Sequence, residues 1–220
     1  MALKVSLKRG ILAGGLLLAG YAQGNDQALL DAVRGGQLHA VQDLIEQGVN
    51  VNARALDGSN ALLLATQANQ IDIARALIEA GADVNQKNLI QDSAYLMAGA
   101  SGCNEILQVT LAHGADLQST NRYGGTALIP ACERGHAATV ALLIKAGTDL
   151  NHVNRLGWTC LIEAIVLADG GPAHQDIVAQ LIAAGADLDL PDRSGIRPLR
   201  LAEQRGQSAI VKLLRDAGAS

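Results

Sequence analysis

The stretch Ala80-Gly81-Ala82-Asp83-Val84-Asn85 decides the fold of this chain, because it returns at nearly constant spacing. Further copies are Gly114-Ala115-Asp116-Leu117, Gly147-Thr148-Asp149-Leu150-Asn151, Gly185-Ala186-Asp187-Leu188-Asp189 and, more faintly, Gly48-Val49-Asn50-Val51-Asn52 and Gly218-Ala219. The first Gly of each copy falls at 48, 81, 114, 147, 185 and 218, so four of the five intervals are 33 residues and one is 38. A period of this length predicts a stack of similar units.

A second marker lies within each period, as in Gly125-Thr126-Ala127-Leu128-Ile129 and Gly157-Trp158-Thr159-Cys160-Leu161, and Arg134-Gly135-His136 follows the first of these. With both markers the chain resembles the ankyrin repeat family, whose pattern runs Gly-x-Thr-Pro-Leu-His, Gly-His and Gly-Ala-Asp-Val-Asn. The resemblance covers about residues 26–220. It implies an all-α solenoid of six helix-turn-helix repeats joined by short β-like finger loops. The repeats are expected at about 26–57, 58–91, 92–124, 125–157, 158–194 and 195–220.

The chain departs from the family pattern at several positions. The family's first-helix His is replaced by Leu30, Leu63, Leu96, Ile129, Ile162 and Arg200, so apolar packing is expected in place of its hydrogen bonds. Asn69 replaces the Gly between the helices of the second repeat, where Asn tolerates a left-handed turn. Gln91 replaces a finger Gly, which predicts a distorted finger.

Two further departures concern the helices themselves. Pro130 falls within the first turns of its helix, where a missing amide is expected to cost up to ~3 kcal/mol and to open the concave side by a kink. The five extra residues of the fifth repeat map to the stretch from Leu167 to Ala173. There Gly170-Gly171-Pro172 is expected to end the first helix and to form a projecting loop.

The N-terminus has the pattern of a secretory signal peptide at residues 1–22. Lys4, Lys8 and Arg9 precede the apolar run 11–19, and the small residues Gly20 and Ala22 stand two apart. This pattern predicts cleavage after Ala22. An uncleaved membrane anchor is the alternative, although the run is about half the roughly 20 residues that a spanning helix needs. The remaining domain, 23–220, is expected in the bacterial periplasm or, alternatively, secreted.

The net charge of the chain limits the classes of partner that it can bind. Without its first 22 residues the chain keeps 14 Lys and Arg against 21 Asp and Glu, a formal charge of −7. An acidic repeat protein is a poor ligand for nucleic acid or an anionic membrane. We therefore expect no nucleic acid, no stable membrane insertion after cleavage, and a monomer.

The chain has three cysteines, Cys103, Cys132 and Cys160. An odd number is unusual for an exported protein, because thiols tend to pair as disulfides in oxidising compartments. Helices of neighbouring repeats stack roughly 8–10 Å apart, whereas bridged Cα atoms lie within about 7 Å. Offset positions on adjacent repeats are therefore not expected to bridge. All three cysteines are interpreted as small apolar fillers, with a redox role as the alternative.

No catalytic, cofactor-binding or metal-binding residues are predicted. The five histidines, His39, His113, His136, His152 and His174, are scattered, and none forms a pair at metal-ligand spacing. No nucleophile elbow frames any Ser. Gly170-Gly171 lacks the Lys of a phosphate-binding loop. The chain is therefore not expected to be an enzyme.

A repeat stack binds with the surface that its period lines up. The resemblance assigns contacts to the finger tips, the residue before each Thr position and the end of each first helix. Exposed aromatic, aliphatic and Arg residues favour an interface, with repeats three to five at its centre. The predicted protein-binding residues are Leu89, Ile90, Arg122, Tyr123, Arg134, Arg155, Leu156, Trp158, Leu167, Arg193 and Ile196. The alternative for Trp158 is that it packs on the neighbouring finger.

The sequence thus predicts a non-enzymatic module that binds a partner protein by rigid recognition, with Arg122, Arg155 and Arg193 steering an acidic partner. By resemblance to exported bacterial ankyrin proteins, the partner is a periplasmic enzyme that it supports, such as catalase, or a toxin that it neutralises. A secreted effector acting on host proteins is a further alternative. So is an accessory protein that hands over haem or metal through Cys103, His136 and Cys132.

Overall fold

A computed structural model describes residues 24–220 of the chain. The predicted signal peptide and its cleavage site lie outside this part. Residues 24–34 are helical. The helices that follow are α2 (Leu38–Glu46), α3 (Ala61–Gln67), α4 (Ile71–Glu79), α5 (Ala94–Ser101), α6 (Asn104–Ala112), α7 (Leu128–Glu133), α8 (Ala137–Ala146), α9 (Cys160–Val166), α10 (Pro172–Ala183), α11 (Pro198–Gln204) and α12 (Ser208–Asp216).

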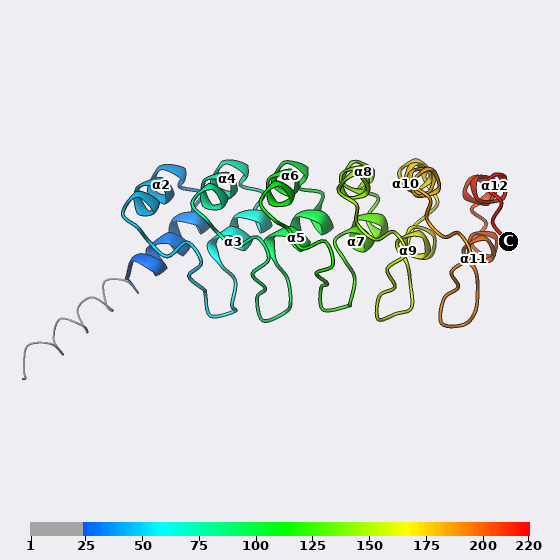
Figure 1. The fold of residues 1–220 in the computed structure, drawn as a ribbon, viewed down its shortest axis with the longest axis horizontal. Coiled ribbons are helices and arrows are strands. Elements are labelled where there is room, and N and C mark those ends of the chain that lie inside the picture. Colours follow the sequence, from blue (N-terminus) through cyan, green and yellow to red (C-terminus); the bar gives the residue numbers. More distant parts are fainter. Residues whose placement is uncertain (1–23) are drawn as a thin grey trace, which may run out of the picture.

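These helices form six antiparallel pairs that stack side by side into one elongated solenoid (Figure 1). The first helices of the pairs make an inner row that includes α3, α5, α7, α9 and α11, and the second helices make an outer row. The loops from each outer helix to the next inner helix project to one side as fingers (Figure 1). Residues 24–220 contain no strand, only an isolated antiparallel bridge between Arg54 and Asn60. The predicted all-α solenoid is confirmed.

The recurring Gly-Ala-Asp-Val-Asn stretch links consecutive repeats. The Asp turns the chain by accepting a hydrogen bond from the amide two residues on, as Asp83 Oδ1 does from Asn85 N at 2.8 Å. The Asn then reaches into the next repeat: Asn85 Nδ2 donates to Gly114 O at 2.8 Å, and Asn85 Oδ1 accepts from Asp116 N at 2.9 Å. The repeat spacing is thus fixed by backbone groups of one copy and a side chain of the copy before it.

The core fills the space between the two helix rows with aliphatic side chains. Five of the six residues that replace the family's His are buried, each at most 3% exposed: Leu30, Leu63, Leu96, Ile129 and Ile162. Apolar packing therefore takes the place of that hydrogen-bond network, as predicted. The sixth, Arg200, lies on the surface of the last repeat and pairs with Glu203 at 3.1 Å.

The finger with Gln91 is regular, so the predicted distortion is wrong. Gln91 adopts the left-handed φ of 66° that Gly would take. Its amide donates to Asn88 O at 3.0 Å, which matches the 2.9 Å bond from Gly124 N to Asn121 O in the next finger. The turn's hydrogen bonds offset the backbone strain. Asn69 also has a left-handed φ, 50°, as predicted.

Pro130 shortens its helix instead of kinking it. In the other inner helices the aligned amide donates to the capping residue's carbonyl, as from Leu64 N to Asn60 O at 3.1 Å and from Glu163 N to Thr159 O at 3.0 Å. Pro130 has no amide to donate, and Thr126 O accepts from Ile129 N at 3.3 Å instead. Helix α7 therefore begins only at Leu128, and Pro130 lies in its first turn, where the bond that is lost is the one from position 130 to Thr126 O.

The five extra residues lie between α9 and α10, as predicted, but the Gly-Gly-Pro segment has the opposite role. Helix α9 ends at Val166, before the glycines. Gly171 is the residue before α10, and Pro172 is its first residue, a position that suits a residue without an amide. The insertion thus lengthens the start of α10 to give a helix of 12 residues.

Two of the cysteines are bridged, so the prediction that all three are only apolar fillers is wrong. Cys132 of α7 and Cys160 of α9 form a disulfide, with their Cα atoms 5.5 Å apart. The spacing of helix axes does not set the distance between residues that face each other, and small side chains at the contact let two backbones approach. Cys103 is buried as a free thiol whose pKa is raised by burial.

Candidate functional site

The predicted binding residues of the finger tips are exposed. Leu89 is 74% exposed, Ile90 52%, Tyr123 57% and Leu156 49%, and all four lie on the fingers. Leu167, which follows α9, is also 49% exposed. Large apolar side chains in water along one edge are typical of an interaction surface.

Trp158 and Ile196 differ from that group. Both are only partly exposed and pack against the hydrophobic core. Trp158 thus packs against the core, and its contribution to binding stays a prediction.

The exposed arginines connect neighbouring fingers. Arg155 Nη1 donates to Arg122 O at 2.8 Å, and Arg193 Nη2 donates to Arg155 O. Arg122 itself pairs with Asp92 at 3.2 Å and lies over the Tyr123 ring, 4.9 Å from its centre. These contacts make the finger row a connected ladder. Steering of an acidic partner stays a prediction.

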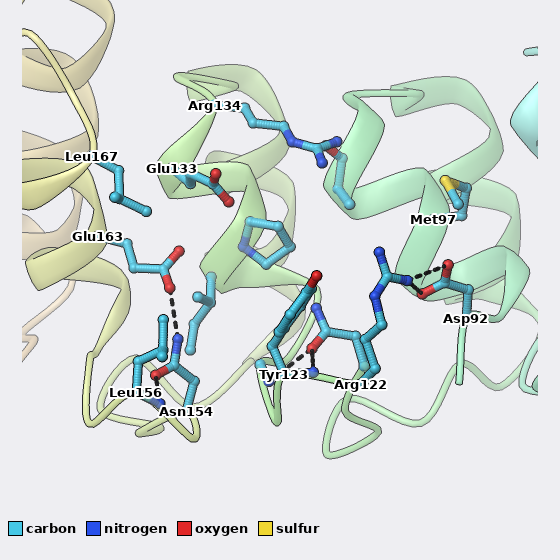
Figure 2. Close-up of a pocket in the computed structure, with 15 residues that line it drawn as sticks. Asp92, Met97, Arg122, Tyr123, Glu133, Arg134, Asn154, Leu156, Glu163 and Leu167 are labelled. Atoms are coloured by element: carbon cyan, nitrogen blue, oxygen red, sulfur yellow. Dashed lines mark hydrogen bonds and ion pairs between the residues drawn. The ribbon is translucent and has the colours of Figure 1, made fainter. Parts of the chain in front are cut away.

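A hollow of about 370 Å³ opens where the fingers and inner helices of repeats three to five meet (Figure 2). Five predicted binding residues line it, namely Arg122, Tyr123, Arg134, Leu156 and Leu167. The hollow is also lined by Asp92, Met97, Ile129, Pro130, Glu133, Asn154 and Glu163. The other predicted binding residues do not line the hollow; these are Leu89, Ile90, Arg155, Trp158, Arg193 and Ile196.

Glu163 is the unusual group of the hollow, because its side chain is charged by type yet the residue is only 5% exposed. Asn154 Nδ2 donates to its Oε1 at 2.6 Å. Burial raises the pKa of Glu163 to about 7, with a smaller contribution from the nearby charge of Glu133, while the Asn154 hydrogen bond lowers it. This carboxyl thus changes its charge near neutral pH.

Neither Glu163 nor Asn154 was among the predicted binding residues. A signal was present in the sequence, because four of the other five repeats carry an apolar residue at the position of Glu163, namely Leu64, Met97, Pro130 and Leu201, and only the first repeat has another acid there, Asp31. The sequence contains no signal for Asn154, because Asn or Asp also occupies its position in neighbouring fingers. There the side chain shapes the turn, as Asn121 does by accepting a hydrogen bond from Tyr123 N.

The histidines make local contacts. His174 Nε2 lies 3.1 Å from Glu133 O, and His152 Nε2 lies 2.7 Å from Gly124 O. Burial and the charge of Arg134 lower the pKa of His136, which packs against Gly102 of the preceding repeat. Within residues 24–220 no three His, Cys, Asp or Glu side chains gather as they would around a metal ion. Among the described helices, none combines the length and apolar character that crossing a bilayer requires.

Known proteins share both the sequence pattern and the stacked helix pairs. The family model for ankyrin repeats in three copies matches residues 11–88 and 95–192. The chain belongs to the ankyrin repeat family. This family is a general protein-interaction fold that is typically non-enzymatic, which agrees with the exposed apolar finger row described above.

Solved ankyrin structures cover most of this chain. An ankyrin repeat domain from Acinetobacter baumannii AYE is 55% identical, with a TM-score of 0.85, and the match covers 87% of this chain and 98% of that domain. The ankyrin repeat protein EF0377 is 41% identical, again with a TM-score of 0.85, over 89% of this chain and 98% of its own. The ankyrin repeat protein YahD of Escherichia coli (strain K12) is 51% identical over only 57 residues, which are 26% of this chain and 28% of that protein.

Proposed function

We propose that this ankyrin repeat protein is exported to the bacterial periplasm and binds a partner protein there without catalysing a reaction. The contact surface would be the finger face, by which we mean the finger tips together with the hollow of repeats three to five. The observation that carries this proposal is the row of large apolar side chains that the fingers hold in water: Leu56, Leu89, Ile90, Tyr123, Val153 and Leu156. Large apolar side chains are seldom gathered in water along one edge of a protein unless a partner covers them.

The rigidity of the finger face also supports binding. Side chains of one finger hydrogen-bond the backbone of a neighbouring finger: Lys87 Nζ donates to Thr120 O of the next finger at 2.7 Å, and Arg155 Nη1 donates to Arg122 O of the preceding finger at 2.8 Å. A surface that is already ordered loses little conformational entropy on docking. Little of the free energy of binding is therefore needed to order the fingers when the partner docks.

The compartment is supported by two features. The sequence at residues 1–22 has the pattern of a signal peptide. The Cys132–Cys160 disulfide is a bond that persists in oxidising compartments such as the periplasm and is rare in the cytosol. The formal charge of −7 that remains after cleavage favours a partner with a basic contact surface.

Affinity capture from periplasmic extract tests this function. Residues 23–220 serve as bait, beside a variant with Tyr123→Ala and Leu156→Ala and a control variant with Lys145→Ala on the outer helix α8. We expect one protein to be retained by the unmodified and K145A baits and lost from the double variant. Equal recovery with all three baits would remove the finger face as the contact surface. Mass spectrometry of the exported protein should give Gln23 as its first residue.

A further inference from the structure

Some of the acidic side chains that line the hollow have a cationic partner and others have none. Asp92 is neutralised by Arg122 at 3.2 Å. Arg134 turns away from the centre and donates through Nη1 to Ala100 O at 2.8 Å (Figure 2). Glu133 and Glu163 project into the same space between repeats four and five (Figure 2). Within residues 24–220, neither of these two carboxylates has a cation within ion-pair distance.

The two glutamates keep free acceptor atoms for a ligand. Of the two carboxylate oxygens of Glu163, only Oε1 has a hydrogen-bond partner among the described residues, namely Asn154. The Glu133 carboxylate accepts no hydrogen bond from any described residue, although its backbone O contacts His174. Glu163 is 95% buried as a residue, and the second oxygen of its carboxylate, which borders the hollow, is free to accept a hydrogen bond from a ligand there.

Apolar groups surround the acidic centre. Leu156 lies on the finger side of Glu163, and Leu167 lies on the other side, beyond the end of α9 (Figure 2). Ile129 and Pro130 of α7 add further apolar wall. Acidic oxygens at the centre with aliphatic walls match a long side chain that has an apolar stem and a cationic head.

We propose that the hollow receives one lysine or arginine side chain of the partner protein, with its cationic head between Glu133 and Glu163 and its aliphatic stem against Leu156 and Leu167. The inference rests on the proposed protein-binding function and names the chemistry that the partner presents. The basic character agrees with the acidic charge of the chain. The proposal concerns the hollow alone, and the acidic partner expected from the finger arginines stays a prediction for the finger tips.

Binding of a cation here depends on pH. The groups that face Glu163 are Glu133 from α7 and Asn154 from the finger, and the other titratable groups that line the hollow are Asp92, Arg122, Tyr123 and Arg134. At pH 6 most Glu163 carboxyls are protonated, because burial raises the pKa of Glu163 to about 7. The incoming cation must then displace a proton. Affinity for a cationic side chain therefore rises between pH 6 and pH 8, by up to about tenfold.

Nuclear magnetic resonance titration tests the site with small probes. N-acetyl-L-arginine methylamide is compared with its uncharged citrulline analogue, and N-acetyl-L-lysine methylamide with its norleucine analogue. The side-chain amide of Asn154 reports on the hollow directly. We expect the cationic probes to shift this signal with a Kd on the order of millimolar, as suits a single side chain. The comparison of arginine with lysine shows which head group is preferred.

Two variants make the result decisive. Glu163→Gln retains an acceptor for Asn154 and should weaken the cationic probes at least tenfold at pH 8. Glu105→Gln, on the exposed face of α6, should leave their affinity unchanged. Equal shifts from arginine and citrulline, or an unchanged affinity in E163Q, would overturn the proposal. Those results would leave the proposed protein-binding function standing, because its own test is the loss of capture in the Tyr123 and Leu156 double variant, which does not require a cationic side chain in the hollow.

Discussion

The side-chain amide of Asn154 donates a 2.6 Å hydrogen bond to the buried carboxyl of Glu163 and so joins a finger to the inner helix that follows it. The other end of the same amide shapes the finger, because Asn154 Oδ1 accepts from Leu156 N at 2.9 Å and from Trp158 N at 3.1 Å. Asn154 therefore stabilises the finger turn and also binds the Glu163 carboxyl in the hollow. Substitutions at Asn154 and at Glu163 separate these two roles.

Replacing Glu163 by Gln should stabilise the protein at pH 8. Burial raises the pKa of this carboxyl from 4.5 to about 7 in the folded state. The folded protein thus holds its proton more tightly than the unfolded chain, and stability falls as pH rises from about 4.5 to about 7. We expect E163Q to unfold with a free energy about 1–3 kcal/mol higher than that of the unmodified protein at pH 8, and with little difference at pH 4. Urea unfolding at both pH values measures this.

The control for this prediction is Glu105→Gln, which removes an exposed glutamate. Its unfolding free energy should follow that of the unmodified protein at every pH. A stability gain in E163Q of the same size at pH 4 and pH 8 would show that the carboxyl does not titrate near neutral pH.

Replacing Asn154 by Asp should keep the finger turn but remove the hydrogen bond to Glu163. Aspartate at the aligned position of the next finger already supports the same turn, because Asp192 Oδ1 accepts from Ser194 N at 2.8 Å and from Ile196 N at 2.9 Å. In N154D, however, Glu163 loses its donor and gains a like charge. We expect a loss of about 2 kcal/mol or more in unfolding free energy at pH 8 and a smaller loss at pH 5.

A double-mutant cycle checks the origin of this loss. In N154D/E163Q the Gln amide donates to the new carboxylate, so most of the lost stability should return. Strictly additive effects of the two substitutions would mean that Asn154 acts through the finger alone.

The disulfide should be present in the exported protein and should stabilise it. Replacing both Cys132 and Cys160 by Ala is expected to lower the unfolding free energy by about 2–4 kcal/mol, because the bond closes a loop of the unfolded chain between residues 28 apart. Alkylation in urea without reductant, followed by mass spectrometry, should modify one thiol, Cys103. The Cys103→Ala variant should take up no label. Three labelled thiols in the unmodified protein would rule out the bond.

Replacing Pro130 by Ala should lengthen α7 and stabilise the fourth repeat. An amide at position 130 would donate to Thr126 O, as the aligned amides of other repeats donate to their capping residues. Thr126 Oγ1, which is buried without a partner, would then be placed to cap the helix. We expect a gain of about 1 kcal/mol in unfolding free energy and slightly more helical circular dichroism. Pro198→Ala is the control, because Pro198 is already the first residue of α11, where no amide is needed. A gain of the same size in P198A would argue against this account.

The repeat architecture was predictable because its signals are local. Each Gly-Ala-Asp stretch carries its own turn, a left-handed Gly such as Gly81 with a φ of 90° followed by an Asp that bonds its own backbone. The apolar residues that replace the family's His, such as Leu63 and Ile162, were recognised as core by their register alone. These features depend on a few neighbouring residues, which are all visible in the sequence.

The errors arose where two repeats meet. Whether Cys132 can reach Cys160 depends on how closely α7 and α9 pack, and the sequence gives no such distance. The packing of Trp158 against the core likewise depends on the stacked structure, while its predicted role in binding stays a prediction. Gln91 takes a strained φ because the finger's hydrogen bonds around it are strong enough to impose it.

By itself, the sequence determined the family, the period, the positions of the turns and most of the core, because each of these follows from backbone preferences and apolar spacing within one repeat. Only the tertiary structure decided that Glu133 of one repeat and Glu163 of the next face a common hollow, and that Asn154 holds the second of them. Stacking sets the distance between side chains of different repeats. Burial and charge at that distance then change the acidity of Glu163, which no stretch of the sequence encodes alone.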